Sequence, residues 1–243
     1  ITATFNEAMA DSPVVKIALS GAATLTATEM SKVSATSYTY SYAVPTANGT
    51  QTVALSVGTD VAGNTITSAP SSGATFVIDS TAPSAFTVGA VAATGNTVVA
   101  SKWNSTNTGV NVTVPVADDA SLTGGTIQLR AKVGNEDYAD LGNAYTITGA
   151  NVPNGRATIS NTAAALEAIS GGVADAEAVI FTAIITDTGS TSTTGTQSGT
   201  TLTFDQTAPT AAITYSTTSP YNNTETVTTV SYTHLTLPTK QAV

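Results

Sequence analysis

Three residues with oxygen-bearing side chains, Asp60, Asn64 and Asp79, could together bind a metal ion. Asp60 and Asn64 bracket the turn-like stretch "DVAGN", and Asp79 ends the apolar run "TFVID". Calcium takes roughly six to eight oxygen ligands, from carboxylates, amide and backbone carbonyls and water. We therefore predict a calcium site if the turn and the end of the run meet at one end of a domain. A strand separates them, so the alternative is that Asp60 and Asn64 build the turn while Asp79 caps the following linker.

Two further groups of carboxylates are close enough in the sequence to be candidates for a calcium site or a catalytic pair. Glu136, Asp137 and Asp140 in "NEDYAD" form a second candidate for calcium, with a solvated loop as the alternative. A glycosidase needs two carboxylates, and Asp118 with Asp119, or Glu136 with Asp140, could be nominated. Adjacency in a loop does not define a cleft, however, so we do not assign a catalytic pair.

The only histidine of the chain, His234, lies in "VSYTHLTLPT", residues Val230–Thr239. The reverse translation of this stretch resembles the transposase adapter used in short-read sequencing libraries. We interpret residues 230–243 as an artefactual tail and set His234 aside. The chain also has no cysteine. Without these residues neither a Ser-His-Asp nor a Cys-His arrangement can form, and a histidine-based zinc site is excluded. We predict that the chain is not an enzyme.

Trp103 in "SKWNST" is the only tryptophan. An exposed indole could stack on a sugar ring, which would make the chain a carbohydrate-binding module. A buried indole would instead fill a core, which is the commoner role of a single tryptophan in a β-sandwich.

The composition favours an all-β protein. Only 9% of the residues are charged, 41% are hydrophobic, and the net charge is −9 with a pI of about 4.2. Threonine and valine, which are β-branched and fit a pleated sheet, are abundant. Seven basic residues spread over 243 cannot build a surface for phosphates, so nucleic acid and anionic membranes are not expected partners. No apolar run reaches the length of a membrane span.

Alternation with period two predicts the strands. In "QTVALSVGTD", Val53, Leu55 and Val57 fall on one face, and Gly63 with Asn64 supplies the positive φ of the hairpin that follows. Asn161 is expected to cap a short helix that Gly171 ends. The other alternating runs are SYTYSY (37–42), GVNVTVPV (109–116), TIQLRAKV (126–133) and the strongly apolar EAVIFTAIIT (177–186).

One pattern of strand, turn, strand and exit linker occurs twice in the sequence, which predicts a tandem array of domains. "VGTDVAGNTITS" aligns with "IITDTGSTSTTG", so Asp60 corresponds to Asp187, and each is followed by Asp-x-Thr-Ala-Pro. Pro83 fixes φ and biases Ala82 towards extended backbone, which sends the chain from one domain into the next. We predict domains at 1–83, truncated at its N-terminus, and at 84–209, the start of a third repeat at 210–229, and the tail at 230–243.

These motifs resemble bacterial immunoglobulin-like (Ig-like) domains of large surface proteins and adhesins. "ITATFNEAM" is similar to their opening strand, and "TDVAGN" followed by "IDSTAP" to their closing hairpin and exit linker. "SLTGGTIQLRAKVGNEDYADLG" is similar to repeats of very long surface proteins. The resemblance implies tandem Ig-like antiparallel β-sandwiches in an extended array, with a short helix in the second unit. In related arrays domain junctions often bind calcium. The second unit departs from the pattern, having "TGSTST" in place of Gly-Asn after Asp187.

The function implied by this resemblance is structural and adhesive. The chain would be a non-catalytic spacer stalk or weak adhesion module of a secreted or surface-anchored bacterial protein, outside the cell. Its partners would be neighbouring Ig-like repeats and host or surface glycans or proteins, with no membrane insertion of this segment. The alternatives are a carbohydrate-binding segment and an accessory region of an extracellular hydrolase.

Overall fold

The computed structural model describes residues 1–212. Residues Ile1–Asp205 form one compact unit, and the chain from Gln206 onward belongs to a second. Of the expected third repeat, at 210–229, all but the first residues lie outside the described part of the chain, and the whole tail at 230–243 lies outside it. The described residues are predominantly β, as the composition predicts, with several antiparallel sheets.

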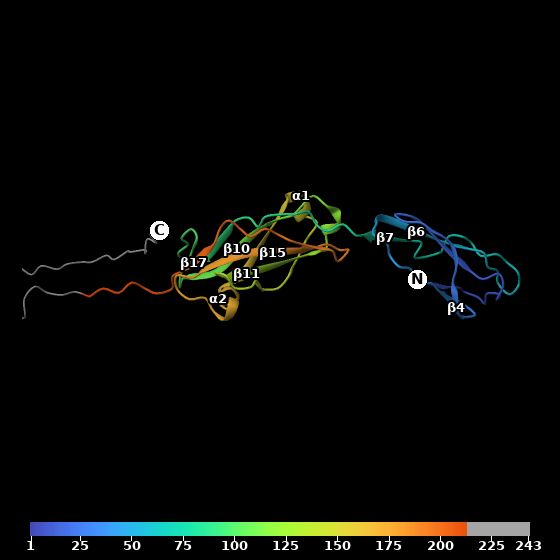
Figure 1. Cartoon of the computed structure of the whole chain (residues 1–243), viewed down its shortest axis with the longest axis horizontal. Helices are drawn as coiled ribbons and strands as arrows, with labels where there is room; N and C mark the ends of the chain where they lie inside the picture. The colour runs from blue at the N-terminus through green and yellow to red at the C-terminus, as the bar shows by residue number, and fades with distance from the viewer. Residues whose placement is uncertain (213–243) are drawn as a thin grey trace, which may run out of the picture. The chain divides into compact units, whose positions relative to one another are not determined.

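Residues 1–79, the N-terminal β region, contain two sheets (β4, β6 and β7 are labelled in Figure 1). One has the order β1-β5-β4 and the other the order β3-β2-β6-β7. The strands are β1 (Thr2–Thr4), β2 (Lys16–Gly21), β3 (Leu25–Glu29), β4 (Ser31–Ser34), β5 (Ser37–Thr39), β6 (Asn48–Ser56) and β7 (Thr75–Asp79).

The alternation in β6 sends Val53 and Leu55 into the core of this region, as predicted. Val57 departs from the prediction: it is 46% exposed and has a φ of 54°, because β6 ends at Ser56 and the chain turns there. The buried cluster draws residues from both sheets, which are therefore the two layers that enclose it. Its members are Met9, Val15, Ile17, Leu19, Met30, Tyr38, Val53 and Leu55.

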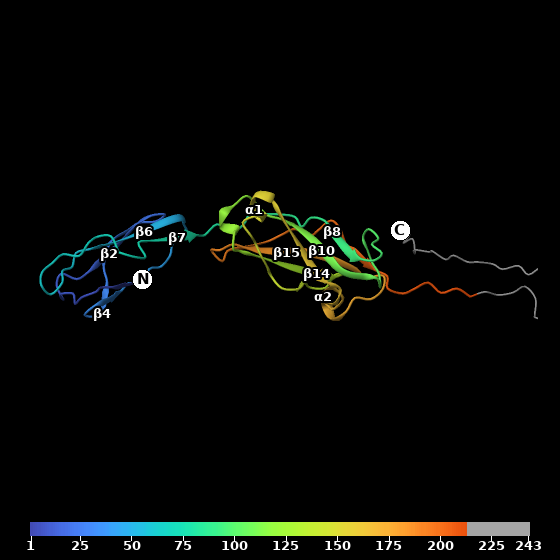
Figure 2. The ribbon, with the colours of Figure 1, turned by 180° about the vertical axis from the view of Figure 1, so that it is seen from behind.

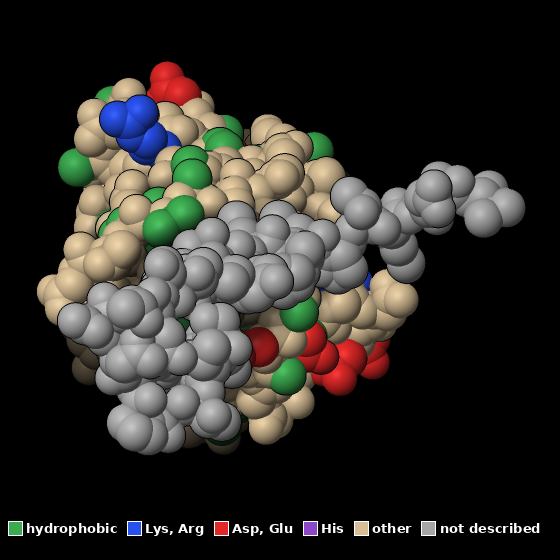
Figure 3. Space-filling model, turned by 90° about the vertical axis from the view of Figure 1, so that its left-hand side faces the viewer, with side chains coloured by type: hydrophobic (Ala, Val, Ile, Leu, Met, Phe, Trp, Pro, Cys, Tyr) green, Lys and Arg blue, Asp and Glu red, His purple; other side chains and the backbone are tan. Residues whose placement is uncertain are grey.

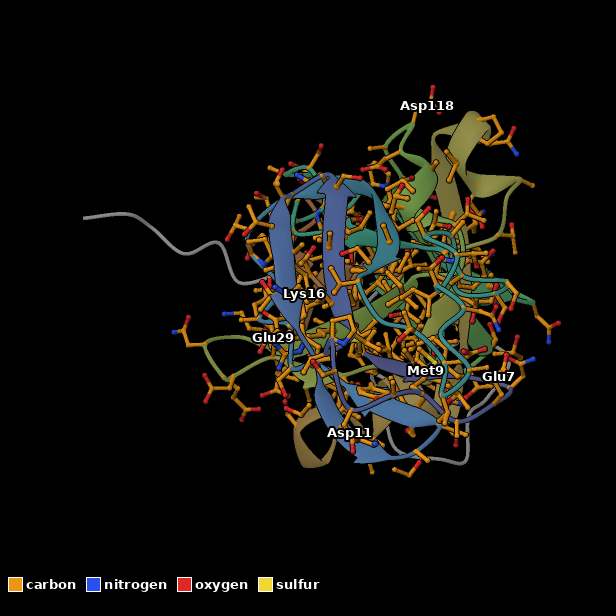
Figure 4. All side chains as sticks on the ribbon, turned by 90° about the vertical axis from the view of Figure 1, so that its right-hand side faces the viewer. Glu7, Met9, Asp11, Lys16, Glu29 and Asp118 are labelled. Atoms are coloured by element: carbon orange, nitrogen blue, oxygen red, sulfur yellow. The ribbon has the colours of Figure 1, made fainter. Side chains whose placement is uncertain are left out.

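Charged side chains of the N-terminal β region lie at its surface. Lys16 of β2 and Glu29 of β3 are opposite one another in the ladder, and their Nζ and Oε1 atoms lie 3.8 Å apart (Figure 4). In the "FNEAM" motif Glu7 is exposed, whereas Met9 is 4% exposed. An exposed ion pair of this kind contributes at most about 1 kcal/mol, so burial of residues such as Met9 determines the stability.

Residues 84–205, the central β region, also contain two sheets, with orders β14-β10-β8 and β12-β11-β15-β17-β9. Strand β13 pairs with β11, and β16 pairs with β15. The strands are β8 (Val91–Gly95), β9 (Lys102–Trp103), β10 (Asn107–Pro115), β11 (Thr126–Val133), β12 (Ala139–Asp140), β13 (Tyr145–Thr146), β14 (Arg156–Thr162), β15 (Ala178–Thr186), β16 (Ser192–Thr194) and β17 (Leu202–Phe204).

The valines of β10 and the alternating residues of β11 and β15 face one buried cluster between these sheets, as the sequence predicts. Strands β11 and β15 pair over their whole facing length, from Thr126 opposite Thr186 to Val133 opposite Val179. Burial of one such apolar side chain stabilises the fold by about 1.5–3 kcal/mol. The two core clusters, one in each region, share no residue.

Short helices connect the strands of the central β region. The predicted helix is present as α2 (Ala163–Glu167) and the 3₁₀ turn η2 (Ile169–Gly171), but its cap is Thr162, whose hydroxyl accepts from the backbone N–H of Ala165. The prediction that Asn161 caps it is therefore wrong by one residue. Helix α1 (Asn151–Asn154) and the 3₁₀ turn η1 (Ala120–Leu122) were not expected. Figure 2 shows α1 and α2 near opposite ends of the strands.

Charged side chains are few on the face of the molecule that Figure 3 shows. Apolar side chains are scattered there among tan atoms. Within residues 1–212, no helix has the length and apolar character needed to span a membrane.

Candidate functional site

Asp60 organises the hairpin that follows β6. Its side chain is buried, and both carboxylate oxygens accept hydrogen bonds from Asn64: Oδ1 from the backbone N–H at 2.8 Å and Oδ2 from Nδ2 at 2.6 Å. These bonds, the side-chain bond first, hold the pKa of Asp60 below its usual value. Gly63 has the positive φ, 94°, that the turn requires. The structure thus confirms the prediction that these residues build the turn.

The Asp187 hairpin of the central β region has the same bonds. Thr191 donates its backbone N–H to Oδ1 of Asp187 at 2.9 Å and its hydroxyl to Oδ2, so threonine replaces asparagine as the donor. Ser190 takes the place of Gly63 with a φ of 66°. The bridge Thr186–Ser192 likewise matches the bridge Thr59–Thr65 of the first hairpin. The two hairpins that the sequence aligns therefore share the same pattern of hydrogen bonds.

Asp79 does not join Asp60 and Asn64. It pairs with Asn48 at the start of β6, whereas Asp60 follows the end of that strand at Ser56. Eight residues of extended strand separate the two ends, about 26 Å at the usual rise. The structure therefore brings Asp60 and Asn64 together and leaves Asp79 apart from them, and calcium binding stays a prediction. Asp79 instead accepts the backbone N–H of Thr81 at 3.1 Å, which is the linker cap that was the alternative.

The other carboxylates are engaged in local structure or exposed. Asp119 caps η1 by accepting from the backbone N–H and hydroxyl of Ser121, while Asp118 points away from the strands (Figure 4). Asp140 pairs with Arg130, with Nε and Oδ1 3.1 Å apart. No group of three His, Cys, Asp or Glu residues suited to a metal ion occurs within residues 1–212.

Trp103 is fully buried in the central β region. Its ring stacks on Phe204, with centroids 5.5 Å apart, and its Nε1–H donates to Glu167 at 3.0 Å. A ring without exposed surface cannot stack on a sugar. The structure therefore confirms the core role and leaves the carbohydrate-binding alternative without its candidate residue.

The linker after β7 lies along the segment that follows the Asp187 hairpin. Thr193 donates its hydroxyl to the carbonyl of Pro83. The hydroxyl oxygen of Thr191, whose one proton goes to Asp187, lies 3.0 Å from the carbonyl oxygen of Thr81. Because alternate residues of a strand point to the same side, both hydroxyls reach the linker. Alternating threonines are common in strands of this chain, so they are a weak sequence signal for such a contact.

Backbone pairing continues the contact beyond Pro83. The N–H of Thr196 donates to Phe86 at 2.8 Å, and the N–H of Val88 donates back to Thr196 at 3.0 Å, which forms a parallel bridge. The ring of Phe86 lies directly over Gly195, where a Cβ would come within 2.3 Å of it. The segment Thr81–Val88, here called the seated linker, is thus an integral part of the central β region.

Two comparisons with known proteins place the chain in no family: no protein-family model matches it, and no curated protein matches it.

Proposed function

We propose that this chain is a non-catalytic structural segment, built from tandem Ig-like β-sandwiches, of a long bacterial protein that is secreted or displayed on the cell surface. It serves there as a spacer stalk or a weak adhesion module, with neighbouring repeats as its constant partners and surface glycans or proteins as occasional ones. The N-terminal and central β regions are the two sandwiches.

The observation that carries the proposal is the seated linker. A spacer must pass tension from one domain to the next through the backbone that joins them. Here the hydroxyl of Thr193 in β16 and the backbone of Thr196 just after it form hydrogen bonds to that backbone. Several hydrogen bonds loaded together resist more force than single bonds broken in turn, so the joint suits a mechanical role.

Single-molecule pulling of the chain by its ends tests the proposal. Two separate unfolding events are expected, because the core clusters share no residue. At about 3.6 Å of contour per residue, they would lengthen the chain by roughly 25 and 40 nm. A single event, or a gradual extension without peaks, would contradict a stalk of two mechanically independent domains.

A further inference from the structure

A groove of about 820 Å³ lies in the N-terminal β region between two stretches of backbone. One wall is the edge of β1 with the residues that follow it to Glu7, and the other is the segment from Asn64 to Gly73. In the central β region the seated linker fills the corresponding place. The two regions therefore differ in what pairs with the backbone along these walls.

The wall that follows the Asp60 hairpin corresponds to the segment that follows the hairpin of the central β region. The bridges that close the two hairpins fix the correspondence. Ala69 lies as far beyond the first bridge as Thr196 lies beyond the second. Thr196 exchanges two backbone hydrogen bonds with the seated linker. Ala69 lines the groove, and its backbone N–H and C=O make no hydrogen bond to any of residues 1–212.

The other wall, the edge of β1, corresponds in the same way to the edge of β10. Strand β1 pairs with β5 and β10 pairs with β14, and each ladder ends with one further bond, donated by the N–H of the residue after the strand, Phe5 or Val116. Thr2 lies as far before Phe5 as Thr113 lies before Val116. The N–H and C=O of Thr2 point away from β5, because the adjacent Ile1 directs its own two groups to that side.

In the central β region these outward groups are paired. The N–H of Thr113 donates to Ala90 at 2.9 Å, and its C=O accepts from the N–H of Gly89 at 2.8 Å. These two residues directly follow the seated linker. One continuous segment, from Phe86 to Ala90, thus pairs first with Thr196 and then with Thr113, and so joins the edges of the two sheets.

The N-terminal β region has the same two edges without a joining segment. Thr2 and Ala69 both line the groove. Among residues 1–212, β1 has β5 as its one partner strand. An extended chain in the groove would pair with both edges by adding a strand, a mode of binding in which main-chain hydrogen bonds supply the affinity.

We propose that this groove is the seat of an extended segment that a neighbouring repeat supplies within the longer protein, as the N-terminal β region supplies Phe86–Ala90 to the central one. The occupant follows an Asp-x-Thr-Ala-Pro motif and pairs with Ala69 and Thr2. The inference rests on the proposed function, because it needs neighbouring repeats. It deepens that function, because each repeat then completes the sheet edges of the next one.

An extension of the full chain tests the proposal. A copy of residues 79–91 is placed before Ile1 and joined to it by a short loop of glycine and serine. In the central β region Val91 lies opposite Val112, which corresponds to Ile1, so a hairpin loop of about four residues spans the join.

Two forms of the extension are compared. The first carries Phe86→Ala in the copy, because Ser68, at the position of Gly195, already has a Cβ. The matched control carries in addition Val88→Pro and Gly89→Pro in the copy. Proline has no backbone N–H, so the control cannot donate the bonds that Val88 and Gly89 donate in the central β region.

Hydrogen exchange at the backbone N–H of Ala69 is the readout. We expect this N–H to exchange at least about tenfold more slowly in the first extended chain than in the control, because it then donates as the N–H of Thr196 does. Equal exchange in the two extended chains would overturn the proposal. So would protection of Ala69 in the unextended chain that grows with its concentration, which would mean that a second copy occupies the groove. Either result would leave the two unfolding events of the pulling experiment unaffected, so failure of this inference is distinguishable from failure of the proposed function.

Discussion

Replacing Gly195 with alanine should destabilise the central β region through the seated linker alone. A Cβ at this position would lie 2.3, 2.7 and 2.8 Å from three ring carbons of Phe86, whereas ordinary contacts begin near 3.4 Å. The ring must therefore retreat by more than about 1 Å, which loses most of its contact with the sheet. Gly195 does not have a positive φ, so the backbone itself accepts alanine.

Overpacking of this kind costs about 1–3 kcal/mol in the free energy of unfolding. For a region of this size we expect the melting temperature to fall by roughly 3–5 °C for each kcal/mol. Gly199→Ala is the matched control: it has open space around the new Cβ and no positive φ. It should leave stability within about 0.5 kcal/mol or raise it slightly.

Urea unfolding of four proteins separates the linker contact from other effects of the new methyl group. These are the wild type, Gly195→Ala, Phe86→Ala and the double variant. If the clash with the ring is the cause, Gly195→Ala should cost little once Phe86 is alanine, and the cycle should show a coupling of about 1 kcal/mol or more. The same cost in both backgrounds would refute the seating of Phe86 over Gly195.

Three further outcomes follow from the hydrogen bonds. Thr193→Val, which removes the hydroxyl bound to Pro83, should cost about 0.5–1.5 kcal/mol in urea unfolding, and no loss would show that this bond is not formed. The pKa of Asp60 is lowered in the folded state, so its ionised carboxylate stabilises the fold at pH values above its unfolded pKa of about 3.9. That stabilisation is lost as the pH falls through the folded pKa. The stability of Asp60→Asn should therefore depend less steeply on pH in acid unfolding, and an unchanged pH dependence would contradict this role of Asp60. Because Asp79 lies far from Asp60, no calcium-dependent rise in melting temperature should require both carboxylates, so a rise abolished equally by Asp60→Ala and by Asp79→Ala would contradict the structure.

The sequence predicted the strands best where alternation continued over many residues. Val110, Val112 and Val114 are all buried, as their spacing indicates, because each contributes to the same sheet face. In β6, Val57 continues the alternation of Val53 and Leu55 in the sequence. It is nevertheless exposed, because the strand ends one residue earlier, at Ser56. Periodicity describes a face and gives no information about where pairing stops.

The candidate site was predicted only in its local part. The bond between Asp60 and Asn64 spans four residues and could be inferred from turn chemistry. The placement of Asp79 depends on its pairing with Asn48 in the sheet. The position of Pro83 depends on the hydrogen bond that its carbonyl accepts from Thr193, 110 residues away. Pairings over such distances follow from the whole sheet arrangement, and no local pattern specifies them.

Hydrogen exchange at the backbone N–H of Val88 and Thr196 tests the central claim most directly, because these two groups pair the linker with the central β region. If the seated linker is part of that region, both amides should exchange as slowly as those of β15, only when the region unfolds. If the amides of Val88 and Thr196 exchanged at the rate of an unstructured chain while those of β15 stayed protected, the central claim would be contradicted. The linker would then be a flexible connection between the two regions.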